Sequence, residues 1–172
     1  MKKTKVYEGK DLILSIYNLS IEGKKVERVI IEHRDVAAIL AFDENNKVIL
    51  VKQHRFSHGY ILEMPAGTLK KGEDPKKCAF REIKEETGYK ATKLTHLITY
   101  YPSVGYNREK VHCFLASKVE KIGDLSLDED EFITVVKIDL KKLLNLIKKG
   151  KIIDSKTICA IFAYLAKKNF VL

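Results

Sequence analysis

The 172-residue sequence has few cysteines, few arginines and no long apolar run. Its three cysteines, Cys78, Cys113 and Cys159, lack metal-ligand and redox spacing, and an odd number fits a reducing compartment. A small disulfide-stabilised fold is therefore excluded, and buried thiols are expected. No stretch approaches the roughly 18 apolar residues that a membrane span needs, and charged residues interrupt any signal-peptide core after the basic start. We therefore expect a soluble, cytoplasmic protein with no membrane partner.

Arginine is scarce, because only 5 of the 32 basic residues are arginine. The net charge of +9 raises the question of nucleic-acid binding, but the lysines are scattered and no aromatic residues interleave with them. We interpret the charge as a solvated, lysine-rich surface that weakly attracts anionic substrates, and we expect no nucleic-acid partner. Arginine binds carboxylates and phosphates through two N–H groups at once, so the few arginines indicate places where that geometry matters, although chance remains an alternative for each.

The chain has no internal repeat and no low-complexity linker, so we expect one domain over residues 1–172. Apolar or alternating segments between turn residues predict strands at residues 11–21, 25–33, 36–42, 48–52, 60–63, 94–101, 111–116 and 133–138. Cap residues and apolar spacing predict three helices, from Pro75 to Gly88, from Asp139 to Gly150, and onward from Asp154 or Ser155. Strands with interspersed helices predict an α/β (α+β) fold with a mixed sheet covered by helices.

Residues 67–89 carry the pattern with the most chemical content. The helix in this segment places Glu82, Glu85 and Glu86 within one arc, because residues three and four apart share a helix face. Such a cluster of oxygen ligands suits a hard divalent cation such as Mg²⁺ or Mn²⁺. An isolated Glu-x-x-Glu-Glu is more often an ordinary charged helix face with basic partners, so the residues around it decide the interpretation.

The spacing in this segment resembles the Nudix box, G-x5-E-x7-R-E-U-x-E-E-x-G-U, in which U is hydrophobic. All seven fixed letters and both hydrophobic positions match, at Gly67, Glu73, Arg81, Glu82, Ile83, Glu85, Glu86, Gly88 and Tyr89. The resemblance implies a Nudix hydrolase with an α/β/α sandwich fold. It also implies hydrolysis of the pyrophosphate of a nucleoside diphosphate linked to another group, with Mg²⁺ as cofactor and Mn²⁺ as a possible substitute.

The resemblance assigns roles to the motif. Glu82, Glu85 and Glu86 would bind the metal together with the backbone carbonyl of Ala66, and Glu82 and Glu86 would also be catalytic. Metal ions that bridge pyrophosphate oxygens neutralise developing charge and acidify a bound water for attack on phosphorus.

The remaining fixed positions of the motif have structural explanations. Gly67 permits a turn that a Cβ would obstruct. Glu73 and Arg81 can form an ion pair that holds the loop against the helix. Gly88 stops the helix.

Outside the motif, residues 51–56 and 63–67 resemble the approach to the box in ADP-ribose pyrophosphatases. Arg55 would correspond to their phosphate-binding arginine, with a surface ion pair as the alternative. Glu63 is either a metal-associated group or a structural salt bridge. The implied reaction converts ADP-ribose to AMP and ribose 5-phosphate. A broader nucleotide-sugar or dinucleotide pyrophosphatase stays open, and so does a non-catalytic nucleotide- or nucleic-acid-binding module.

Residues 101–109 resemble the substrate loop of the same enzymes, with one departure. The marker proline would fall at Val104, whereas Pro102 lies two positions earlier. Ser103 and Glu109 are candidate substrate-binding residues, with loop capping as the alternative.

Residues 127–133 follow the family's acidic loop. By motif position, Glu129 resembles the mobile catalytic base and Glu131 an additional metal-facing carboxylate. A loop location suits a base that reaches the attacking water without binding the metal tightly.

The N-terminal region departs at residues 32–35, which read Glu-His-Arg-Asp where relatives often have Glu-His-Pro-Gly. Arg34 is a candidate contact to substrate phosphate or to a neighbouring subunit, with turn capping as the alternative. The resemblance implies that the strands within residues 1–35 exchange between the subunits of a homodimer, leaving residues 36–172 as the catalytic core. Core packing is the stronger interpretation for three aromatic residues that are candidates to stack on adenine, namely Tyr7, Phe56 and Tyr106.

Overall fold

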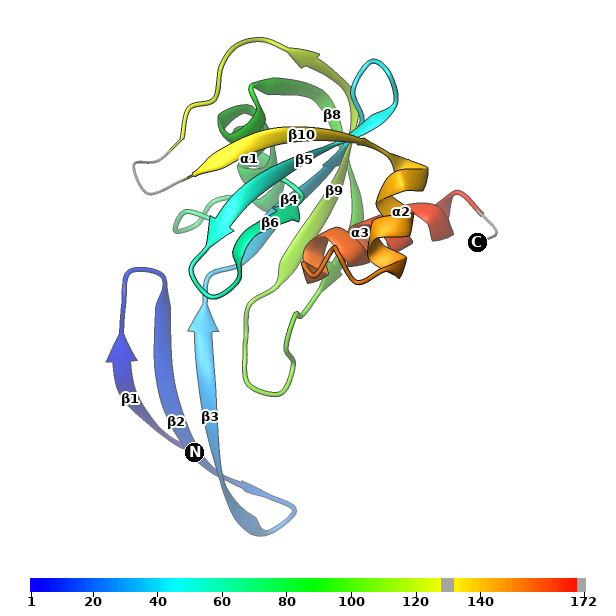
Figure 1. Ribbon diagram of the computed structural model, residues 1–172. Coiled ribbons are helices and arrows are strands. Elements are labelled where there is room, and N and C mark those ends of the chain that lie inside the picture. The colour runs from blue at the N-terminus through cyan, green and yellow to red at the C-terminus, as the bar shows by residue number, and fades with distance from the viewer. Residues whose placement is uncertain (128–131, 170–172) are drawn as a thin grey trace.

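The computed structural model describes residues 1–127 and 132–169. Its first three strands form a separate antiparallel sheet in the order β1 (Lys2–Glu8), β2 (Leu12–Ile21) and β3 (Lys24–His33). This N-terminal sheet projects from the rest of the chain (Figure 1). The predicted hairpin is confirmed, with positive φ at both Glu22 and Gly23, as in the tight turns that match strand twist.

Strand β1 was not expected from the sequence, which we interpreted there only as a basic start. Every residue of β1 is exposed, so the strand shows no alternation of buried and exposed positions. Pairing with β2 satisfies its backbone groups along one side, and its lysines suit the open edge of a sheet.

The body of the chain contains two further sheets. A mixed sheet has the order β7-β4-β9-β8, formed by β7 (Ala66–Thr68), β4 (Val36–Ala41), β9 (Val111–Lys121) and β8 (Tyr89–Tyr100). Within it, β4 and β9 run parallel. An antiparallel sheet has the order β10-β5-β6, formed by β10 (Ile133–Asp139), β5 (Lys47–Arg55) and β6 (Gly59–Glu63). The strand β7 lies inside the Nudix-like motif and was not predicted.

The three predicted helices are α1 (Pro75–Thr87), α2 (Leu140–Lys148) and α3 (Ser155–Lys167). The Asp74 carboxylate accepts the first free N–H groups of α1, and Gly88 ends that helix in the left-handed conformation. At α3 the Asp154 carboxylate accepts the N–H of Thr157. Local chemistry therefore fixes where these two helices begin, and it was readable from the sequence.

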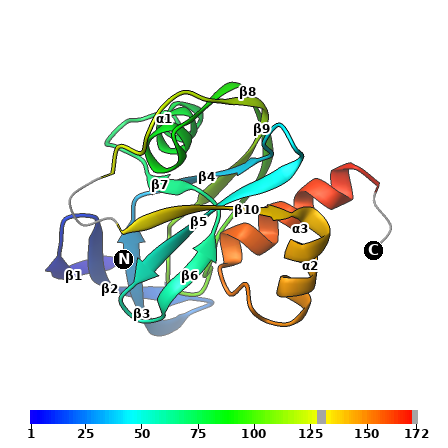
Figure 2. The ribbon, with the colours of Figure 1, turned by 45° about the horizontal axis from the view of Figure 1, so that its top comes forward.

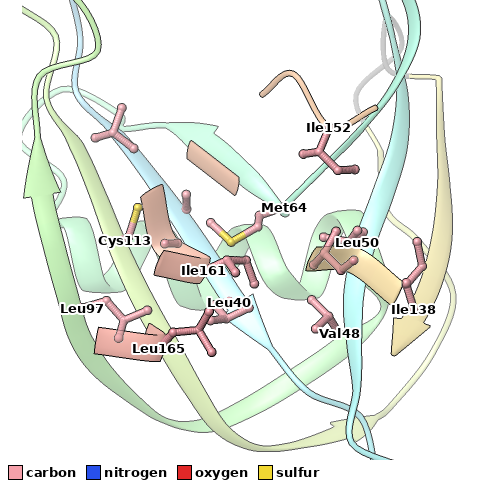
Figure 3. Close-up of a cluster of buried hydrophobic side chains, with 14 residues drawn as sticks. Leu40, Val48, Leu50, Met64, Leu97, Cys113, Ile138, Ile152, Ile161 and Leu165 are labelled. Carbon is pink, nitrogen blue, oxygen red and sulfur yellow. The ribbon is translucent and has the colours of Figure 1, made fainter. Parts of the chain in front are cut away.

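Helices cover the body from two sides, with α1 on one and α2 and α3 on the other (Figure 2). The first core cluster contains Leu40, Leu50 and Ile161, packed under α2 and α3 (Figure 3). The second contains Ile39, Ile49 and Ile83, under α1. This arrangement confirms the predicted α/β/α class with a mixed sheet.

The β8–β9 loop connects the body to the N-terminal sheet. The N–H of Ile31 donates to the carbonyl of Tyr106 at 2.7 Å, and the N–H of Arg108 donates to the carbonyl of Ile31 at 3.0 Å. The guanidinium of Arg108 also lies over the ring of Tyr17, 5.2 Å from its centroid. The last part of β3 is thereby held beside the strands that surround the site.

Among the described residues, no helix has both the length and the apolar character that crossing a membrane requires. The three cysteines are free thiols, of which Cys78 and Cys113 are buried and Cys159 is partly buried. The burial expected for the thiols is thus confirmed in full at two of the three positions.

Candidate functional site

A cleft of about 380 Å³ opens where β3, β5, β7, the box helix α1, the β8–β9 loop and the start of α3 come together. Its wall is rich in charged side chains, among them Arg55, Glu86, Glu109, Asp154 and Lys156. A charged and concave surface of this kind suits an anionic ligand held by several polar groups.

The helix α1 carries the three motif carboxylates, and of these Glu86 lines the cleft. Glu82 and Glu86 are 6% and 2% exposed, although glutamate is rarely buried without compensation. Glu85 is partly exposed. Burial of two neighbouring carboxylates is costly in stability, which points to a functional reason for their position.

The predicted ion pair between Glu73 and Arg81 is confirmed. The Nε and Nη2 atoms of Arg81 each lie 3.1 Å from an oxygen of Glu73. Its Nη1 contacts Glu82 at 2.5 Å and Glu85 at 2.9 Å. Hydrogen bonding from Arg81 lowers the pKa of Glu73. Burial alone would lower the pKa of Arg81, but hydrogen bonds to Glu73 and Glu85 and the charge of Glu82 raise it.

The structure gives a different reason for a glycine at position 67 from the one predicted. It lies in the strand β7 rather than in a turn, and a Cβ built on it would fall 1.9 Å from Oε1 of Glu82 and 2.0 Å from its Cδ. Glycine therefore leaves room for the Glu82 carboxylate beside the strand.

The neighbouring residue, Ala66, ties the same strand to the helix. Its N–H donates to Oε2 of Glu86 at 2.9 Å, and both residues line the cleft. The carboxylate of Glu86 is thereby fixed at the edge of the cleft.

The donor set on α1 fits a hard divalent cation in its chemistry. Glu82, Glu85 and Glu86 offer oxygen atoms only, which is the preference of Mg²⁺ and Mn²⁺. In the part of the chain that the structure describes, no three acidic, His or Cys side chains converge as a ready metal cage. Arg81 instead neutralises Glu82 and Glu85.

Arg55, predicted as a phosphate ligand, lines the same cleft as Glu86. Its Nε and Nη2 donate to the two oxygens of Glu63 at 2.8 and 2.9 Å. The ammonium of Lys156 also contacts Glu63. Of the two interpretations of Glu63, the structure shows the salt bridge.

Lys156 and Asp154 line the cleft and were missed as site residues. In the sequence, their segment is recognisable only as the start of a helix. The separation between Lys156 and Glu63, 93 positions, gives no local pattern that could have linked them.

The loop residues divide into two groups. Glu109 lines the cleft, 3.5 Å from Nδ1 of His33 and 3.2 Å from Nδ2 of Asn107. Ser103 is outside the cleft lining drawn from the described residues, and its carbonyl accepts the N–H groups of Tyr106 and Asn107 in a turn.

Arg34 bonds within its own chain, to the carbonyl of Leu69 at 2.9 Å and to the carboxylate of Asp11. It too falls outside the described cleft lining.

The candidates Glu129 and Glu131 lie outside the described residues. The core-packing interpretation was wrong for three aromatic residues, which are 58%, 101% and 54% exposed: Tyr7, Phe56 and Tyr106.

Comparison with known proteins agrees with this geometry. The NUDIX domain matches residues 32–161. The chain is 40% identical over 170 residues to an ADP-ribose pyrophosphatase of Bacillus subtilis (strain 168), which covers 97% of this chain and 91% of the relative. It is 35% identical to a methanol dehydrogenase activator of Bacillus methanolicus, over 94% of this chain and 89% of the relative.

A solved structure described as an ADP compounds hydrolase superposes with a TM-score of 0.81, covering 99% of this chain and 95% of that one. At 21% sequence identity, this likeness supports the fold alone. The match of the NUDIX domain to most of the chain, together with the pyrophosphatase relative, shows that the chain belongs to the Nudix hydrolase family.

Proposed function

We propose that this Nudix hydrolase is a Mg²⁺-dependent ADP-ribose pyrophosphatase that forms AMP and ribose 5-phosphate. The observation that carries the proposal is that the buried carboxylate Glu86 and the guanidinium of Arg55 line the same cleft. A diphosphate between them meets an oxygen-ligand helix on one side and a bidentate phosphate donor on the other. The pyrophosphatase relative supports the choice of ADP-ribose.

Glu82, Glu85, Glu86 and the Ala66 carbonyl are the proposed metal ligands, with Mn²⁺ as a possible substitute for Mg²⁺. A bound ion would supply charge neutralisation at the pyrophosphate and a water of lowered pKa. By holding that ion, Glu82 and Glu86 would act in catalysis. Arg81 and Glu73 keep α1 and the preceding loop in register, which preserves the positions of these carboxylates.

Residues at the cleft wall orient the substrate in this proposal. Arg55 donates N–H groups to a phosphate oxygen, and Glu109 accepts hydrogen bonds from ribose or base at the opposite end. Ser103 and Arg34, which pack in the adjoining turn and strand connection, would shape the substrate loop. Glu129 as general base and Glu131 as an additional metal-facing carboxylate complete the set by motif position.

We also propose a homodimer in which residues 1–35 join the two subunits and residues 36–172 form one catalytic core. The N-terminal sheet exposes apolar side chains that a second subunit would cover, including Val6, Tyr7 and Val29. We place the enzyme in the cytoplasm, because three free thiols suit a reducing compartment.

The substrate is tested with a panel compared by kcat/KM, with and without Mg²⁺, and with products identified by mass. The panel contains ADP-ribose, ADP-glucose, GDP-mannose, NADH, diadenosine polyphosphates and 8-oxo-dGTP. We expect AMP and ribose 5-phosphate from ADP-ribose at the highest kcat/KM, and only when Mg²⁺ is present. A preference for a dinucleoside polyphosphate would contradict the choice of substrate. Failure to hydrolyse any of these compounds would contradict the enzymatic assignment.

A further inference from the structure

Four charged side chains of alternating sign run from the cleft to the start of α3. Arg55 pairs with Glu63, Glu63 contacts Lys156, and the ammonium of Lys156 lies 2.9 Å from Oδ1 of Asp154. The side chain of Arg55 is 43% exposed, whereas that of Lys156 is 14% exposed. Glu63, between the two cations, is only 1% exposed.

Hydrogen bonds fix the backbone around these four charged side chains. The N–H of Met64 donates to Oγ1 of Thr157 at 2.8 Å, and that hydroxyl donates to Asp154 at 2.5 Å. The residue directly after Glu63 is therefore bonded to the residue directly after Lys156. Because both segments are fixed, Lys156 has a defined position relative to Glu63 and is not a mobile surface lysine.

The negative charges of Glu63 and Asp154 explain why a lysine is needed at position 156. A buried carboxylate requires compensation, and Glu63 has two cations, Arg55 and Lys156, which both line the cleft. Burial acts to lower the pKa of Lys156, but the charges of Asp154 and Glu63 raise it, so the side chain stays a cation. Without it, Glu63 and Asp154 would place an additional negative charge beside the cleft, which repels a polyanionic substrate.

The ion pair with Glu63 also determines which N–H donors of Arg55 are available to a ligand. Glu63 binds Nε and Nη2, so Nη1 is left outside the pair. A guanidinium clamped along one edge presents its other donors in a fixed orientation, which lowers the entropic cost of binding phosphate.

We propose that Lys156 is a positioning residue for pyrophosphate binding, because it compensates the charge of the buried Glu63 and so lets Glu63 hold Arg55 in its phosphate-binding orientation. The inference deepens the proposed function and rests on a diphosphate occupying this cleft. It assigns to the start of α3 a role in substrate affinity, not only in packing.

The test is a double-mutant cycle of Lys156→Met and Glu63→Gln, read as KM and kcat on the best substrate of the panel. Lys141→Met, an exposed lysine on α2, is the matched control. We expect Lys156→Met to raise KM about tenfold while kcat changes far less, and Lys156→Arg to restore most of the affinity. In the Glu63→Gln background the same change has a much smaller effect, because Lys156 acts through Glu63.

An unchanged KM in Lys156→Met overturns the proposal. So does an equal loss in both backgrounds, since that result means a direct contact between Lys156 and the substrate. If Lys156→Met does not fold, Lys156→Gln, which keeps a polar contact to Glu63, takes its place with the same expectations.

Calorimetric binding of inorganic pyrophosphate separates this inference from the proposed function, because it needs no turnover. We expect about tenfold weaker binding in Lys156→Met and unchanged binding in Lys141→Met, whichever nucleotide is the substrate. Equal pyrophosphate affinity in the two variants, or no binding by the unmodified protein, overturns the inference.

Discussion

The N-terminal sheet and the body of this protein are stabilised in different ways. Between residues 1 and 33 only Ser15 and Tyr17 are buried. In the body, all residues of the segments 37–41 and 48–51 are fully buried. Burial of apolar area stabilises the body, whereas backbone pairing and polar contacts hold the sheet together. A sheet of this kind depends on its neighbours, which the body provides and which a second subunit would add in the proposed homodimer.

The side-chain contacts within the N-terminal sheet are polar as well. Tyr17 donates to Glu32 at 2.7 Å, and the Lys3 ammonium lies 2.6 Å from the same carboxylate. Exposed ion pairs contribute little on their own, so these contacts add much less stability than the two core clusters of the body. The described catalytic candidates, Glu82 and Glu86, lie on α1 in the region with the rigid core, which suits groups that need fixed positions.

The largest expected effect is a loss of catalytic rate when a carboxylate is removed from the body, compared with no loss when one is removed from the N-terminal sheet. Glu86→Gln keeps the shape of the side chain but removes a charge at the edge of the cleft. We expect kcat to fall about a thousandfold, because the metal ion that Glu86 is proposed to hold would stabilise transition-state charge by several kcal/mol. The control is Glu27→Gln on the exposed strand β3, which leaves kcat unchanged. Full activity in Glu86→Gln would remove the functional distinction between body and sheet.

The second effect compares stability at two apolar positions. Leu50→Ala, in the first core cluster, should reduce the free energy of unfolding by about 3 kcal/mol. Val29→Ala, at a side chain that is 49% exposed on β3, should change it by less than about 0.5 kcal/mol. Urea unfolding measures both, and similar losses at the two positions would refute the comparison.

A third and smaller effect is expected from removing residues 1–33. Both core clusters lie between Val36 and Leu165, so the shortened chain should still unfold cooperatively, with its midpoint lowered by less than about 10 °C. Light scattering should show a monomer where the whole chain forms a dimer. Loss of cooperative unfolding would mean that the sheet is part of the core's stability.

The smallest expected effect is a loss of stability in the N-terminal sheet at low pH. Hydrogen bonds from Lys3 and Tyr17 lower the pKa of Glu32 from 4.5 to about 2. A lowered carboxyl pKa contributes stability above the unfolded value, near 4.5, and that contribution is lost as the pH falls toward 2. Hydrogen exchange in β2 and β3 should therefore quicken between these pH values. Glu32→Gln should abolish this pH-dependent step, and an identical step in both proteins would assign it to other groups.

Local chemistry made much of the molecule predictable. The caps at Asp74 and Gly88, the Glu22-Gly23 turn and the spacing of the box residues are short-range patterns, and each was found where expected. The strand β1 has no such pattern because all of it is exposed.

Contacts between segments that are far apart in the sequence could not be predicted from it. The Glu63–Lys156 pair joins positions 93 apart, and the reason for Gly67 is a side chain on a later helix. The exposure of Phe56 likewise depends on how β5 and β6 end, which composition does not specify. These features follow from packing, so they require the folded chain.

The most direct test of the account is the binding of Mn²⁺, measured by the loss of the free-ion electron paramagnetic resonance signal in the presence of AMP. The account predicts that the unmodified protein and Glu27→Gln bind Mn²⁺ equally and that Glu86→Gln binds it at least about tenfold more weakly. Equal Mn²⁺ affinity in all three proteins would contradict the claim that the carboxylates of α1 hold the metal.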